Sequence, residues 1–142
     1  MKKLVILSLS LVVLAALLVC GCQILGVGPS DEELVSATMA DWKAALIAHD
    51  LDNLMGTYSE DYVSTQGGGK DSVREFIAGA IEQGYLDNVK VNLEDAQIMI
   101  EGDKAKIGPV ELTSDAGTYV LEYTLQKEDG AWLIVGSKYL EQ

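Results

Sequence analysis

The chain has 142 residues, 22 of them acidic and ten basic, and its two cysteines lie one residue apart. This length suffices for one domain with a single hydrophobic core. The net charge of −12 at pH 7 argues against binding to nucleic acid or to anionic lipid headgroups, which carry the same sign.

The first residues have the parts of a secretory signal. Residues 1–3 carry two lysines, residues 4–19 are apolar apart from two serines, and the small Gly21 follows shortly after. The apolar stretch is shorter than the roughly 20 residues that a membrane-spanning helix needs, and no cluster of Lys or Arg follows it. We predict a signal peptide over residues 1–21.

The end of this segment, Val19-Cys20-Gly21-Cys22, resembles the lipobox of bacterial lipoproteins. The resemblance implies that Cys22 becomes the first mature residue, with diacylglycerol on its sulfur and an acyl chain such as palmitate on its amine. Cys20 would leave with the signal. Its place inside the box departs from the usual pattern.

Other interpretations of the two cysteines are weaker. A Cys20–Cys22 disulfide would be strained and would close almost no loop, and a redox pair normally has two intervening residues. A simply secreted protein and an uncleaved anchor stay open as alternatives.

The lipoprotein interpretation predicts a location in the bacterial cell envelope. Acyl chains buried in the bilayer would hold the protein there. Since Gln23 and not Asp follows the lipidated position, the family's sorting signal implies the periplasmic side of the outer membrane in a host with two membranes. Residues 22–30 form a tether that stretches to at most about 26–29 Å, so the domain at 31–142 is expected close to the membrane.

The mature part of the chain predicts helices followed by a sheet. Ser30 and Glu33 form a capping-box pattern for a helix that runs up to His49, and Asp50 can cap a second, short helix. A third helix is predicted from near Asp71 to Gly84. From residue 89 the apolar residues alternate, with turns at 101–103, 115–117 and 128–130 and the longest strands at 118–126 and 131–139. This order is typical of an α+β domain.

Two stretches carry a family resemblance, WKAALIAHDLDNLMGTYSEDYV at residues 42–63 and YTLQKEDGAWLIVGSKY at residues 123–139. They resemble the nuclear transport factor 2-like superfamily, which includes SnoaL-like domains and ketosteroid isomerase. The resemblance implies a curved antiparallel sheet wrapped around the N-terminal helices into a cone with an internal pocket. It also implies a homodimer, joined through the outer face of the sheet.

The resemblance does not extend to the catalytic groups of ketosteroid isomerase. That enzyme's helix tyrosine, aspartate base and protonated aspartate would fall on Trp42, Gln66 and Glu122. Trp42 has no acidic hydroxyl and Gln66 cannot take up a proton, so we do not expect that activity. Glu122 could donate from a neutral carboxyl inside an apolar pocket, although its alternation with Leu121 and Tyr123 favours the outer face of the sheet.

The candidate pocket residues are aromatic side chains and this one carboxyl group. In a cone they would line the pocket, with tyrosine hydroxyls as polar groups; otherwise they fill the core. The candidates are Trp42, Tyr58, Tyr62, Tyr119, Glu122 and Tyr123.

Other features predict no catalytic residue, cofactor or metal. His49 is the only histidine and is expected to be an exposed residue at a helix end. The three glycines before Lys70 lack the pattern of a phosphate-binding loop, and no His, Cys, Asp or Glu grouping has the spacing of metal ligands.

The sequence therefore favours a lipid-anchored domain that binds a small apolar molecule or a protein partner without catalysis. An envelope enzyme of the SnoaL-like type, acting as an isomerase or hydrolase on a small apolar substrate, is one alternative. A structural, homodimerising module is the other.

Overall fold

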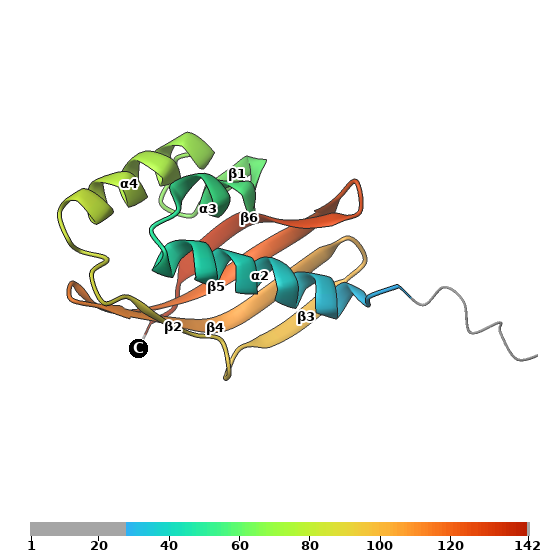
Figure 1. Cartoon of the computed structure of the whole chain (residues 1–142). Helices are drawn as coiled ribbons and strands as arrows, with labels where there is room; N and C mark the ends of the chain where they lie inside the picture. Colours follow the sequence, from blue (N-terminus) through green and yellow to red (C-terminus); the bar gives the residue numbers. More distant parts are fainter. Residues whose placement is uncertain (1–27, 142) are drawn as a thin grey trace, which may run out of the picture.

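The computed structural model describes residues 28–141. The predicted signal peptide, Cys22 and most of the tether lie outside the described residues, so the predictions made for them stay predictions. Three helices lie on one side of a curved sheet (Figure 1), which confirms the α+β class. The elements are α2 (Asp31–Ile47), α3 (Leu51–Gly56), β1 (Tyr58–Ser64), α4 (Lys70–Glu82), β2 (Lys90–Asn92), β3 (Gln97–Glu101), β4 (Lys104–Ser114), β5 (Gly117–Glu128) and β6 (Ala131–Tyr139).

The first helix begins with the predicted capping box. Ser30 Oγ accepts a hydrogen bond from the backbone N–H of Glu33 at 3.2 Å, and the Ser30 N–H donates to Glu33 Oε2 at 2.7 Å. One side of α2 packs onto the sheet because its apolar residues recur every three or four positions. The buried residues of α2 are Val35, Met39, Trp42, Ala45 and Leu46.

The two shorter helices also begin and end close to the predicted positions. Asp50 caps α3 by accepting a hydrogen bond from the Asn53 N–H at 3.1 Å. α4 begins at Lys70, and Gly84 turns the chain just after its end with a φ of 74°, a conformation that suits glycine because it has no Cβ. Only Ala80 of α4 is fully buried.

The sheet has the strand order β1-β6-β5-β4-β2, and β3 pairs with the other half of β4. Hairpins join β3 to β4, β4 to β5 and β5 to β6 at the three predicted turns. The prediction of an antiparallel sheet is wrong at one edge, because β1 and β6 run parallel and the sheet is mixed. No hairpin links these two strands, which lie far apart in sequence, so nothing local sets their relative direction.

Two bulges alter the predicted strands. β4 is longer than β6, although 131–139 was predicted to be one of the two longest strands. β4 continues through Pro109, because this proline lies at a bulge between Ile107 and Val110 where no ladder hydrogen bond is required. In β6, Ile134 pairs with Leu125 but Gly136 pairs with Thr124, so one residue, Val135, is extra. This bulge reverses which side chains of β6 face the helices beyond that point.

Candidate ligand-binding pocket

A pocket of about 440 Å³ lies between the helices and one end of the sheet. Its walls come from α2, α3 and α4, from β1 and the loop after it, and from the adjoining ends of β4, β5 and β6. This volume is within the range of small-molecule sites, roughly 300–1,000 Å³.

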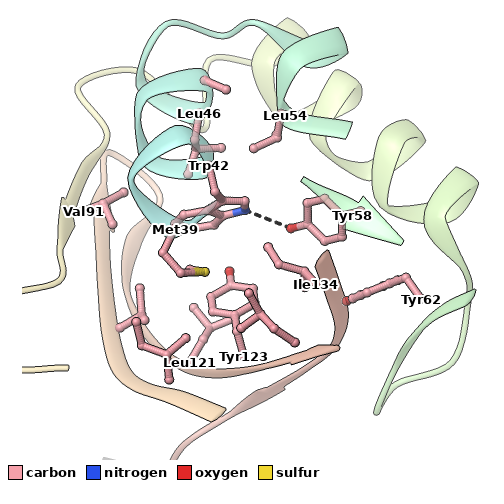
Figure 2. Packing of buried hydrophobic residues seen from close by; sticks show 14 of the residues in the cluster. Met39, Trp42, Leu46, Leu54, Tyr58, Tyr62, Val91, Leu121, Tyr123 and Ile134 are labelled. Atoms are coloured by element: carbon pink, nitrogen blue, oxygen red, sulfur yellow. Dashed lines mark hydrogen bonds between the residues drawn. The ribbon is translucent and has the colours of Figure 1, made fainter. Parts of the chain in front are cut away.

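The base of the pocket is a cluster of one tryptophan and three tyrosines, shown in Figure 2. Trp42 Nε1 donates a hydrogen bond of 3.0 Å to the hydroxyl of Tyr58. The rings of Trp42 and Tyr123 lie 5.0 Å apart, and those of Tyr58 and Tyr62 meet edge to face at 5.1 Å. These contacts fix the ring positions and leave the hydroxyls as the polar groups of an apolar base.

Burial makes these hydroxyls poor acids. Loss of hydration raises the pKa of Tyr58, Tyr62 and Tyr123, because the charged phenolate is the form that burial penalises. All three are therefore protonated near neutral pH. They can donate hydrogen bonds, but they do not act as bases.

Tyr62 and Tyr123 differ in what their hydroxyls contact. The Tyr62 hydroxyl lies 2.6 Å from Ser137 Oγ and is already paired. Among residues 28–141, no group hydrogen-bonds the hydroxyl of Tyr123, although this side chain is only 4% exposed. Since Tyr123 lines the pocket and its hydroxyl is not among the buried polar atoms cut off from a partner, this O–H is available to donate to a molecule in the pocket.

The mouth of the pocket carries exposed aromatic rings. Phe76 of α4 is 68% exposed, and Tyr119 and Tyr139 lie 6.1 Å apart on β5 and β6. Tyr85, after α4, is also exposed and lines the same pocket. Exposed apolar groups beside a concavity are typical of binding surfaces.

Five of the six predicted pocket residues lie together in this pocket: Trp42, Tyr58, Tyr62, Tyr119 and Tyr123. Glu122 does not line it. Its carboxylate pairs with Lys138 of β6 at 3.0 Å on the other face of the sheet. Successive side chains of a strand point to opposite faces, so Glu122 points away because Leu121 and Tyr123 point inward.

The remaining candidates lie at the edge of the site or outside it. Gln66 lines the mouth, in the loop after β1. His49 does not line the pocket; it has a φ of 55°, and its Nε2 lies 3.1 Å from the carbonyl oxygen of Leu86. It connects the end of α2 to the loop after α4.

The sequence interpretation missed Ser137 and Tyr139, which line the pocket from β6. Uninterrupted alternation from the buried Trp132 and Ile134 would turn both outward, and the bulge at Val135 turns them inward. The alternation of apolar residues in β6 does not reveal that the strand contains an extra residue, so this part of the pocket wall was not predictable from the sequence.

Within residues 28–141, no three His, Cys, Asp or Glu side chains are close enough together to hold a metal ion. No helix in this range has the length and apolar character needed to cross a membrane.

Several solved structures share this architecture. An NTF2-like protein of unknown function from Shewanella oneidensis is 20% identical, with 79% of this chain and 100% of that chain covered and a TM-score of 0.61. NTF2-like proteins from Shewanella baltica and Cytophaga hutchinsonii, both 12% identical, cover 81% and 80% of this chain and 100% of theirs, with TM-scores of 0.63 and 0.62. No protein-family model matches the chain, and no curated protein sequence matches it either. The domain therefore has the nuclear transport factor 2-like fold, with a curved, unclosed mixed sheet.

Proposed function

We propose that this protein is a lipid-anchored component of the cell envelope that binds a small, neutral and mainly apolar molecule. The observation that carries the proposal is the pocket, which combines an apolar wall, an aromatic mouth and a base of tyrosine hydroxyls. Attachment through Cys22 supplies the location and rests on the lipobox pattern.

The character of the wall supports a neutral ligand. The chain has 22 acidic and ten basic side chains, yet the residues that line the pocket are all uncharged. A charged ligand would lose its hydration there without gaining an ion-pair partner, which costs several kcal/mol or more. A phosphate or carboxylate group is therefore disfavoured.

The base of the pocket supports one polar group on the ligand. The Tyr123 hydroxyl is a protonated donor without a partner among the described residues. A carbonyl or ether oxygen would accept its hydrogen bond, and a net contribution of about 0.5–1.5 kcal/mol is typical of such a bond. We therefore expect the ligand to carry a hydrogen-bond acceptor on an apolar body.

The same groups favour binding over catalysis. Proton transfer at neutral pH requires a group whose pKa lies near the working pH, whereas burial moves the pKa of the pocket tyrosines upward, away from neutrality. Glu122, the carboxyl group that could have acted as an acid, is paired with Lys138 on the opposite face. The SnoaL-like enzyme is thus the weaker proposal.

A matched pair of dyes tests the neutral-ligand proposal. N-phenyl-1-naphthylamine is neutral, and 1-anilinonaphthalene-8-sulfonate has nearly the same aromatic body with a negative charge. We expect the neutral dye to raise the unfolding temperature and to quench Trp42 fluorescence in a Trp132→Phe background, because Trp42 lines the pocket. Equal binding of both dyes would contradict a charge-selective pocket, and no response to either would contradict a ligand-binding function.

A further inference from the structure

The chain enters the domain at one end of its long axis. At the start of α2, Asp31 Oδ1 accepts hydrogen bonds from Lys127 Nζ at 2.8 Å and from Trp132 Nε1 at 3.1 Å. These partners flank the turn between β5 and β6. The described part of the chain therefore begins beside this turn, at the blue start of α2 in Figure 1.

The pocket opens at the other end of the same axis. Its mouth is formed at the turn between β4 and β5, by Ser114, Ala116 and Tyr119, and at the end of β6 by Tyr139. β5 runs from the mouth to the tether end. A straight strand of its 12 residues is about 35–40 Å long.

The tether is too short to invert the domain over its anchor. Residues 22–30 reach at most about 26–29 Å when fully extended. Turning the mouth onto the membrane would lift Ser30 by about the length of β5, roughly 35 Å for a straight strand, which exceeds this reach. The mouth therefore stays away from the leaflet that holds the lipidated residue.

We infer that the pocket exchanges its ligand with the aqueous compartment that faces away from the anchoring membrane, and not with the leaflet that holds Cys22. This inference rests on the proposed lipid anchor. It defines the ligand further, as a neutral molecule that reaches the protein through water or on a soluble carrier. Lipids of the anchoring leaflet are not the ligand.

Energy transfer to the membrane surface tests the orientation. The mature lipoprotein would have no free thiol, since Cys20 is removed and Cys22 is acylated. A single introduced cysteine can therefore carry a donor dye, at the tether end in Asp103→Cys or at the mouth end in Glu141→Cys; both positions are exposed. The protein is reconstituted in vesicles that contain a headgroup-labelled acceptor lipid.

We expect severalfold lower transfer from Glu141→Cys than from Asp103→Cys. Equal transfer, or higher transfer from the mouth end, would overturn the inference. The unsubstituted protein, treated with the same dye, is a separate control. Its labelling at a free Cys22 would overturn the proposed lipid anchor as well. A failure to bind dyes would overturn the ligand proposal and leave the measured orientation unaffected.

A probe held in the membrane tests the exchange itself. An N-phenyl-1-naphthylamine group attached by a short linker to a lipid headgroup in the same leaflet should not quench Trp42, whereas the free dye should. Quenching by the lipid-linked dye would overturn the inference, provided that the same lipid does quench Trp42 when dispersed in detergent with the protein.

Discussion

The indole N–H of Trp42 and the hydroxyl of Tyr58 form a hydrogen bond of 3.0 Å that joins α2 to β1 at the base of the pocket. Both side chains are buried, at 2% and 5% exposure. The bond leaves the Tyr58 ring edge-on to Tyr62, so it holds the aromatic base in place.

Breaking this bond should destabilise the domain measurably. Trp42→Phe leaves the Tyr58 oxygen without its donor, and Tyr58→Phe leaves the indole N–H without its acceptor, so each should cost about 1–3 kcal/mol. Urea unfolding of both variants and of the double variant gives the coupling energy, expected near 1 kcal/mol. Additive effects of the two changes would contradict the bond.

Buried tyrosines make stability fall at alkaline pH. Because the pKa of Tyr123 is raised in the folded state above its ordinary value of 10.0, the folded chain keeps a proton that the unfolded chain releases. The contribution of Tyr123 to the free energy of unfolding is therefore complete below pH 10.0 and is lost as the pH rises above that value. Tyr123→Phe should reduce the slope of stability against pH there by about 1.4 kcal/mol per pH unit.

The exposed Tyr85, which is part of the mouth, supplies the matched control. Tyr85→Phe makes the same chemical change without removing a buried hydroxyl. When the free energy of unfolding of this variant is measured above pH 10.0, its slope against pH should be close to that of the unsubstituted protein. A reduction as large as that of Tyr123→Phe would show that burial is not the cause.

Asp31 should contribute to stability at neutral pH and not in acid. Hydrogen bonds from Lys127 and Trp132 lower the pKa of this carboxyl below its ordinary 3.8. The contribution of the ionised Asp31 to stability is present above pH 3.8 and is lost as the pH falls through the lowered pKa of this carboxyl. Asp31→Asn should therefore destabilise the protein at neutral pH, and the difference should disappear in strong acid. A difference that is independent of pH would contradict the ion pair.

The anchoring prediction separates the two cysteines. Cys22→Ser should leave the protein uncut or release it from the membrane fraction, whereas Cys20→Ser should change little, because that residue is removed with the signal. Mass spectrometry of the mature N-terminus reads the modification directly. An acyl group on Cys20, or an unmodified chain that starts at Gln23, would refute the assignment.

Local signals predicted the helices and turns of this fold well. Ser30, Glu33, Asp50 and Gly84 act within a few residues of themselves, and the structure places each in its predicted role. Phe76 lies on the apolar side of α4, yet it is largely exposed, since this part of α4 lines the pocket and does not fill the core.

Features that depend on distant strands were less predictable. The parallel pairing of β1 with β6 and the bulge at Val135 are set by the pairing of strands and not by local sequence. These two features decide which residues of β6 enter the pocket. Alternation alone did place Glu122 correctly on the outer face, since no bulge interrupts β5 between Leu121 and Tyr123.

The central claim is that a neutral ligand accepts a hydrogen bond from Tyr123 in this pocket. Calorimetric titration with 2-acetylnaphthalene and 2-ethylnaphthalene tests it, because the two compounds have similar size and differ by a carbonyl oxygen. Tyr123→Phe should weaken binding of the ketone about tenfold, as expected for one lost hydrogen bond, and leave the hydrocarbon unaffected. Glu122→Gln, on the opposite face of the same strand, should change neither affinity. Equal weakening of both compounds by Tyr123→Phe, or no binding of either to the unsubstituted protein, would contradict the account.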